Sequence, residues 1–371
     1  MEYRKLGKTG LVVSAIGMGT EYLINRPREE VIPVIREGIA RGINFFDLFF
    51  AQSQFRDNMG AAFQGHRERV FLGAHLGAVE QNGQEDRTRD PREAETFFHD
   101  FLRRYHTDHA DVLFMHNIDE QEDYDRVMNP EGLLGLALRL KREGKARSIG
   151  FSGHTVATSL QAVESGQVEV LMFPINLTGQ ATPGKKELFS ACAERGVGLV
   201  AMKPYAGGKL LAKERKLAVE NWQTGGGDLQ LERSVSVTPV QCLAYVLAQT
   251  GLSTTIPGVK DLTELDAALA YWQASDGERD YSAILSDFRQ YVMGECVYCN
   301  HCLPCPSAID IGQTIRLFEA AERRMTEEVA GAYAALPTHA DDCTQCGSCV
   351  ERCPFGVDAM GKMEQAAALF S

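Results

Sequence analysis

The sequence has no long hydrophobic run, little tryptophan and no excess of positive charge. Its 371 residues include only 2 tryptophans, and 50 acidic residues outnumber 38 basic ones, which gives a formal net charge of -12. No apolar run reaches the ~18 residues of a membrane span, and the start of the chain carries no targeting pattern. Surplus negative charge repels phosphate backbones. We therefore expect a cytoplasmic protein that binds neither membranes nor nucleic acid.

Cysteine is scarce outside one C-terminal stretch. Of the 10 cysteines, all but Cys192 and Cys242 lie between residues 296 and 353. They form two runs of the form C-x-x-C-x-x-C, each followed by a Cys-Pro pair, which is typical of loops that bind [4Fe-4S] clusters. In two-cluster ferredoxins the last cysteine of each run binds the other cluster. The sequence thus predicts two clusters, one bound by Cys296, Cys299, Cys302 and Cys353 and the other by Cys343, Cys346, Cys349 and Cys305.

Zinc sites and disulfides fit these cysteines less well than clusters do. Two zinc sites would also consume eight thiolates, but a third cysteine at the same spacing and the trailing prolines fit zinc poorly. A disulfide framework is typical of small secreted chains, whereas this chain is long and confines its cysteines to one end. The first run has two residues rather than three before its Cys-Pro pair, so the loop around Cys305 departs from the usual bacterial spacing.

Upstream of the cysteines, short apolar segments alternate with longer amphipathic ones, which predicts βα units on a parallel sheet. Eight strands are expected, and eight strands favour a closed TIM (β/α)8 barrel with its chemistry at the carboxyl ends of the strands. The expected strands are 14–19, 43–50, 70–75, 110–116, 148–152, 168–176, 198–203 and 253–257. The expected domains are a barrel over residues 1–275 and an α-helical, ferredoxin-like domain over residues 276–371, with one long helix over 311–329.

Several short motifs occur in an order that resembles the aldo/keto reductases, in particular their branch with a C-terminal ferredoxin-like region. The matching segments are Tyr3 to Leu11, Gly42 to Asp47, Asp111 to His116, Ile149 to His154, Met202 to Pro204 and Ile256 to Gly258. The resemblance implies a carbonyl reductase that transfers hydride from a nicotinamide. It also implies an aspartate, a tyrosine, a lysine and a histidine in the barrel mouth, with the tyrosine as proton donor.

Only half of that catalytic set is present. Asp47 matches the aspartate and His116 the histidine, but Gln52 stands in place of the tyrosine and His75 in place of the lysine. An amide cannot give up a proton at neutral pH, so the usual acid is missing. Asp47 would favour the imidazolium form of His75, which would then serve as an acid, while His116 would polarise or protonate a substrate oxygen.

The resemblance also implies a nicotinamide site. The residues at the matching positions are Ser152, Asn176, Lys203, Gly207, Gly208, Gly258 and Lys260. Lys260 is the cation left to neutralise a phosphate, and the acidic residues Asp261, Glu264 and Asp266 oppose one. We therefore expect NADP(H) to bind weakly or not at all, which would leave the clusters to supply electrons to a substrate or to a bound flavin.

These observations predict an oxidoreductase in which two [4Fe-4S] clusters pass electrons to or from a small organic substrate at the barrel mouth. An electron-carrier protein would then be a second partner. Two alternatives stay open: an NADPH-dependent carbonyl reductase that uses His75 and His116 as acids, and an electron-transfer protein with a non-catalytic barrel. The acidic run from Asp119 to Asp123 is expected to be a solvated loop.

Overall fold

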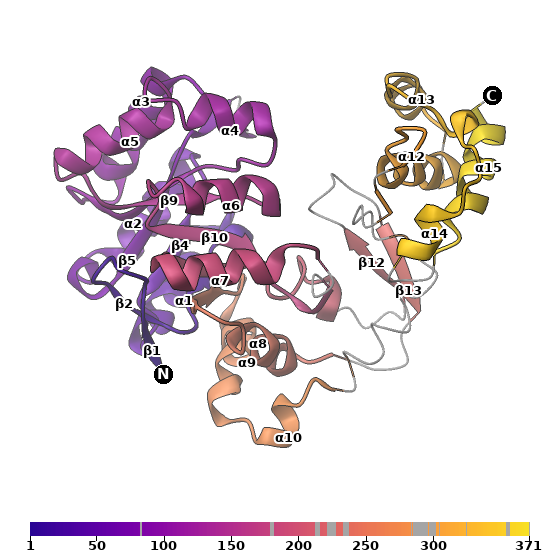
Figure 1. The fold of residues 1–371 in the computed structure, drawn as a ribbon. Coiled ribbons are helices and arrows are strands. Elements are labelled where there is room, and N and C mark those ends of the chain that lie inside the picture. Colours follow the sequence, from indigo (N-terminus) through magenta and orange to yellow (C-terminus); the bar gives the residue numbers. More distant parts are fainter. Residues whose placement is uncertain are drawn as a thin grey trace. The chain divides into compact units, whose positions relative to one another are not determined.

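The computed structural model describes the chain except for residues 82–83, 179–181, 212–215, 221–227, 233–236, 283, 285–295, 297–301, 304, 324, 354–356 and 371. The chain divides into two compact units. The first contains Met1–Gln180, Gly184–Leu211 and Val237–Tyr281, and the second contains the remaining residues (Figure 1). The predicted domain boundary between residues 275 and 276 stays a prediction.

The first unit is built on eight parallel strands in the order β14-β11-β10-β9-β8-β5-β4-β3. Their bounds are β3 Met18–Gly19, β4 Phe45–Leu48, β5 Phe71–Leu76, β8 Ala110–Met115, β9 Ala146–Ser152, β10 Val170–Pro174, β11 Gly198–Met202 and β14 Leu252–Ile256. Parallel bridges from Ile16 to Thr255 and from Gly19 to Gly258 join the first and last strands. The predicted barrel is therefore confirmed, with a first strand shorter than expected. The antiparallel pair β1 (Tyr3–Lys5) and β2 (Val12–Ser14) precedes it.

Helices surround these strands, as Figure 1 shows. Among the contacts that hold them, α3 packs on β5, α5 on β9 and α7 on β11. The α-helices of this unit are α1 Arg28–Ala40, α2 Ser53–Phe63, α3 Pro91–Arg104, α4 Gln121–Val127, α5 Leu133–Arg142, α6 Val156–Glu164, α7 Lys185–Arg195, α8 Pro239–Leu247, α9 Leu262–Leu269 and α10 Asp276–Arg279. N-cap residues determine where several of these helices begin. The Asp90 carboxylate accepts from the Arg92 amide at the start of α3, and Thr238 and Gln241 form a capping box at the start of α8.

Large side chains fill the barrel interior below the mouth. Phe45, Phe114, Val170, Val200 and Ile256 belong to one buried cluster. The Phe114 ring needs a neighbour without a side chain, because a Cβ on Gly150 would lie 2.3 Å from its Cδ1 atom. The interior at this level is thus packed.

A β-hairpin is inserted directly after β5. Its strands β6 (Ala78–Gln81) and β7 (Gln84–Arg87) are antiparallel. The Thr88 amide donates to the Gly77 carbonyl at 2.8 Å and closes the base of the hairpin. A second antiparallel pair, β12 (Lys216–Glu220) and β13 (Asp228–Glu232), belongs to the second unit.

The helices of the second unit are α12 Ile311–Arg323, α13 Glu327–Ala334, α14 Ser348–Arg352 and α15 Ala359–Phe370. The prediction of one helix over residues 311–329 is wrong. The Thr326 side chain accepts from the Val329 amide and starts α13 there, and Met325 just before it is exposed. Ile315, Phe318 and Met363 form the core of this unit, and the Tyr333 and Phe370 rings stack with centroids 3.8 Å apart.

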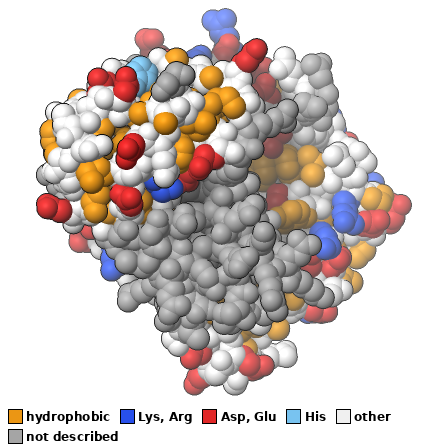
Figure 2. All heavy atoms as spheres, turned by 90° about the vertical axis from the view of Figure 1, so that its right-hand side faces the viewer, with side chains coloured by type: hydrophobic (Ala, Val, Ile, Leu, Met, Phe, Trp, Pro, Cys, Tyr) orange, Lys and Arg blue, Asp and Glu red, His pale blue; other side chains and the backbone are white. Residues whose placement is uncertain are grey.

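Surface charge agrees with the composition. On the face shown in Figure 2, red acidic side chains are scattered over the described surface and blue basic ones are fewer. Within the described residues, no helix is both long enough and apolar enough to cross a membrane.

Candidate functional site

Polar side chains from successive strand ends meet at the mouth of the barrel. They surround a cavity of about 140 Å³ whose polar wall is formed by Glu21, Asp47, His75, His116, Ser152, His154 and Lys203. Phe49, Met172, Met202 and Ile256 provide the apolar wall. The carboxyl ends of parallel strands lie at one rim of a barrel, so residues far apart in the sequence converge here.

Two histidines and an aspartate form a buried hydrogen-bonded chain in this mouth. His75 Nε2 lies 2.8 Å from Asp47 Oδ1, and His75 Nδ1 lies 2.9 Å from His116 Nδ1. All three residues are at least nine-tenths buried. When His75 donates its Nε2 proton to Asp47 and carries no second proton, its Nδ1 accepts from the Nδ1–H of His116. The contact between the histidines thus couples their tautomers.

His116 is held from several sides. Burial lowers its pKa to about 4, the neighbouring Glu85 partly opposes this, and His75 and Arg89 contribute to the lowering. The Arg89 guanidinium donates to the backbone carbonyls of His116 and Asn117 at 2.8 and 2.7 Å. Phe49 stacks on the His116 ring with centroids 6.1 Å apart. His116 is consequently neutral near pH 7, with its Nε2 atom as a proton acceptor.

Glu21 is a site residue that the sequence analysis missed. It follows β3 and contacts both the mouth cavity and a neighbouring groove. Burial raises its pKa to about 7, with the Asp47 charge adding to the rise. Its carboxylate fits against two glycines, because a Cβ on Gly19 or Gly258 would lie 2.6 or 2.4 Å from a Glu21 oxygen. Glu21 lies on the first βα loop, at the same rim of the barrel as the other βα loops. The rule that barrel chemistry lies on these loops would have identified it.

A second hydrogen-bonded chain, built around His154, lines the same cavity. His154 Nδ1 is 3.0 Å from Asp119 Oδ2, and His154 Nε2 is 2.8 Å from Lys203 Nζ. Asp123 in turn binds Arg89 at 2.7 Å. The expectation of a solvated acidic loop from Asp119 to Asp123 is therefore wrong for these two residues, since both carboxylates position cations or imidazoles of the mouth.

The predicted nicotinamide residues divide between the mouth and the groove. The groove is a cavity of about 260 Å³ that Lys203, Gly207, Gly208, Gly258 and Lys260 line, whereas Ser152 lines the mouth. The Asn176 amide donates to the Lys203 carbonyl at 3.1 Å and so supports that residue in a left-handed conformation with φ of 56°. Lys260 Nζ lies 2.6 Å from Glu264 Oε1, so a carboxylate already neutralises the cation expected to bind phosphate.

The second unit gathers cysteines of both runs around one cavity. Its walls include Cys302, Cys305, Cys343, Cys346 and Cys349, among them the four residues predicted to bind one cluster. Cys353 accepts from the Val357 amide at 3.4 Å, and Cys296 packs against the core of the same unit. Cys299 lies outside the described residues. None of the nine described cysteines is in a disulfide bond. A set of thiols on one cavity is the donor set that a cubane cluster requires.

Comparison with known proteins now gives the family. Residues 15–284 match the model of the aldo/keto reductase family. The chain belongs to the aldo/keto reductase family. Residues 292–357 match the model of a 4Fe-4S dicluster domain. The protein is thus an aldo/keto reductase-like oxidoreductase of small molecules with a C-terminal 4Fe-4S domain.

Individual relatives are distant. L-galactose dehydrogenase of Arabidopsis thaliana is 25% identical over 291 residues, which cover 73% of this chain and 88% of the relative. An aldo-keto reductase of Bacillus halodurans in its holo form has a TM-score of 0.61 at 20% identity, with 78% of this chain and 96% of that chain covered. A proposed aldo-keto reductase of Pseudomonas aeruginosa has a TM-score of 0.58 at 23% identity, with coverages of 73% and 94%. These solved structures show the fold alone.

Gln52, which was expected at the family's tyrosine position, is not among the residues that line the mouth cavity. It precedes α2, and its buried side-chain oxygen has no hydrogen-bond partner within the described chain. Phe49 lines the cavity instead. His75, which was expected at the family's lysine position, lies between Asp47 and His116.

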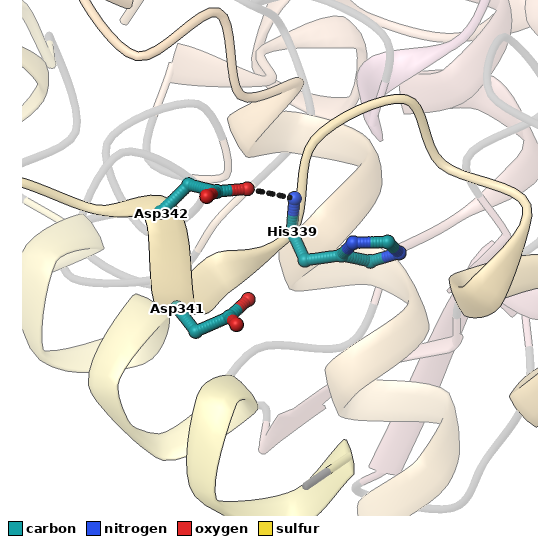
Figure 3. A group of neighbouring side chains, drawn as sticks. All are labelled: His339, Asp341 and Asp342. Carbon is teal, nitrogen blue, oxygen red and sulfur yellow. Dashed lines mark hydrogen bonds between the residues drawn. The ribbon is translucent and has the colours of Figure 1, made fainter.

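A group of polar residues near the second cysteine run has a structural explanation. His339, Asp341 and Asp342 lie close enough to hold a metal ion, and Figure 3 shows them. The Asp342 carboxylate accepts from the His339 backbone amide at 3.0 Å, and the imidazole points away from it toward the Tyr333 carbonyl, 3.1 Å from Nε2. These contacts cap the short helix η6 (Ala340–Asp342), which leads directly into Cys343.

The neutral state of His116 predicts a pH-dependent stability. Because burial depresses its folded pKa below the unfolded value of about 6.5, the unfolded chain binds the extra proton and folding weakens as the pH falls through that range. Between pH 7 and 5.5 the wild type should lose about 1 kcal/mol more unfolding free energy than His116→Gln, as measured by urea denaturation. Parallel stability curves for the two proteins would contradict the buried neutral imidazole.

Proposed function

We propose that this protein is an oxidoreductase whose two [4Fe-4S] clusters exchange electrons with a small organic substrate at the barrel mouth, while Asp47, His75 and His116 move protons. The observation that carries the proposal is the buried chain of these three residues. It retains acid–base groups where the family's phenol and lysine are absent. A cavity of about 140 Å³ suits a small substrate.

Cys343, Cys346, Cys349 and Cys305 would bind one cluster, supported by their common cavity. Cys296, Cys299, Cys302 and Cys353 would bind the other, and the Val357 amide would hydrogen-bond the Cys353 sulfur and so influence its electron density. When bound, a [4Fe-4S] cluster supplies or takes up one electron at a time. An electron-carrier protein would exchange these electrons with the clusters, and the thiolate sites suit a reducing, cytoplasmic environment.

The protein residues would bind, orient and protonate the substrate. A carbonyl that becomes an alcohol takes up two electrons and two protons, and the oxidation of an alcohol releases them. Asp47 lines the cavity and would take the proton of an alcohol. His75 and His116, which is neutral near pH 7, would take it up in turn through the contacts at 2.8 and 2.9 Å. The distant relative named L-galactose dehydrogenase makes aldoses the first substrates to test.

A second candidate is an NADPH-dependent carbonyl reductase that uses His75 and His116. One observation favours it: the groove with Gly207, Gly208 and Gly258 shares Glu21 and Lys203 with the mouth, as a site for a hydride donor would. The Lys260–Glu264 ion pair opposes it, because the Glu264 carboxylate lies beside the lysine and repels a phosphate.

Ligand substitution should separate the two clusters. In Cys305→Ser, iron in anaerobically reconstituted protein should fall from about eight to about four atoms per chain, because one of two cubane sites loses a thiolate. Cys192→Ala removes a buried cysteine of the barrel and should keep the full iron count. Iron content and the visible absorption near the cluster bands give the measurement. Equal iron in Cys305→Ser and wild type, or zinc in place of iron, would count against the assignment.

Removal of the central histidine should slow catalysis. His75→Ala breaks the contacts with both Asp47 and His116, so turnover of the first active substrate should fall by about 100-fold or more. His99→Ala changes a half-exposed histidine on α3 and serves as the control. The rate is measured with a viologen dye as electron donor or acceptor, after iron content has been matched. Wild-type turnover in His75→Ala would remove that residue from the mechanism.

Titration with NADPH distinguishes the two candidate functions. Because the Glu264 carboxylate pairs with Lys260, we expect no saturable increase in NADPH fluorescence at micromolar concentrations. Glu264→Gln frees the lysine and should strengthen whatever binding exists. Saturable micromolar binding to the wild type would support the NADPH-dependent reductase instead.

A further inference from the structure

The hairpin after β5 brings an acidic side chain to the outer end of the mouth network. Glu85 lies on β7, and its Oε1 atom is 3.6 Å from His116 Nε2. That separation is too long for a hydrogen bond, and a side-chain shift of a few tenths of an ångström would allow one whenever either Glu85 or Nε2 carries a proton. Nothing in the sequence pattern predicted this contact, because the segment between β5 and α3 carries no strand of the barrel.

The contacts form one continuous path of polar atoms. From the outside inward, Glu85 meets His116 Nε2 at 3.6 Å, His116 Nδ1 meets His75 Nδ1 at 2.9 Å, and His75 Nε2 meets Asp47 Oδ1 at 2.8 Å. The exposed fraction of the side chains is 36% for Glu85 and 10% for His116. It is 3% for His75 and 8% for Asp47. The path therefore runs from solvent to a buried carboxylate that lines the substrate cavity.

Each imidazole in the path uses both of its nitrogens. A neutral imidazole accepts a proton at one nitrogen and releases another proton from the other, which is what a relay requires. The low pKa of His116, caused mainly by burial, means that a proton stays on the ring only briefly. The charged groups that act on this ring are Glu85, which stabilises its cation, and His75 and Arg89, which oppose it.

The surroundings hold the path in place. Arg89 follows the hairpin and binds the carbonyls after β8 and the Asp123 carboxylate, so the hairpin base is fixed to the strand that carries His116. A Cβ on Gly77 would lie 2.9 Å from the Thr88 carbonyl oxygen, and φ at Gly77 is 96°, so the base of the hairpin depends on this glycine. The hairpin is thus part of the mouth architecture.

We propose that Glu85 is the solvent entry point of a proton wire that runs through His116 and His75 to Asp47. This inference rests on the proposed function, in which electrons arrive separately from protons. Glu85 takes a proton from water and passes it to His116 Nε2, the His116 Nδ1 proton moves to His75 Nδ1, and the His75 Nε2 proton moves to Asp47. One proton enters and one reaches Asp47, which protonates a substrate oxygen. Both rings must then return to their starting tautomers before the next transfer. The same steps in reverse order carry a proton from Asp47 to Glu85 and into solvent.

The test compares Glu85→Gln with Asp86→Asn in the full, cluster-loaded chain. Both variants remove one negative charge from the same hairpin, and Asp86 contacts only its neighbouring backbone amide among the hydrogen bonds resolved for it. The first readout needs no substrate: exchange of the His75 and His116 ring N–H protons with water, followed by NMR of protein labelled with 15N-histidine. Exchange should be at least about 10-fold slower in Glu85→Gln and unchanged in Asp86→Asn.

A second readout is turnover. Glu85→Gln should lower kcat about 10-fold or more, raise the solvent isotope effect and leave KM nearly unchanged, and added formate should restore part of the rate. Ring N–H exchange at the wild-type rate in Glu85→Gln would overturn the wire. Absence of turnover in wild-type protein with full iron would refute the proposed function instead, and the exchange measurement would still decide the wire.

Discussion

Closure of the parallel sheet between β3 and β14 is the constraint on which the mouth depends. The bridge from Gly19 to Gly258 brings the first and last strand ends together, and neither position has room for a Cβ beside the Glu21 carboxylate. Only a closed barrel places Asp47, His75, His116 and Lys203 around one cavity, because each comes from a different strand end. A sheet that failed to close would leave these polar groups in water, which would compete for their hydrogen bonds.

We propose that Asp47 and His116 keep two of the family's four catalytic positions within a different network. The aldo/keto reductase pattern has a phenol that gives a proton while a nicotinamide gives hydride, so both arrive in one step. Here two imidazoles in direct contact replace that arrangement, and a carboxylate lies near each end of their chain. Such a network carries protons but no electrons, which is why we assign the electrons to the cysteine-rich unit. The ion pair between Lys260 and Glu264 agrees with that division, because it weakens the site for a charged dinucleotide.

Much of the fold could be predicted from the sequence, since buried parallel strands form nearly continuous apolar runs such as Ala110–Met115. The ends of those strands identified Asp47, His75 and His116. Glu85 could not be found in this way, because it lies on an inserted hairpin whose sequence signal is the Asn82-Gly83 dipeptide. The contact between two histidine Nδ1 atoms depends on rotamers that a sequence does not specify. The break before α13 was missed because its N-cap, Thr326, lies inside an otherwise helical pattern.

We propose that iron bound by the eight cysteines supplies electrons to a mouth that handles protons alone. Electron paramagnetic resonance of anaerobically prepared protein, reduced with a strong low-potential reductant, measures that iron. We expect the signals of reduced [4Fe-4S] clusters that integrate to about two spins per chain. Protein that contains zinc instead of iron, or that gives no paramagnetic iron signal under these conditions, would contradict it.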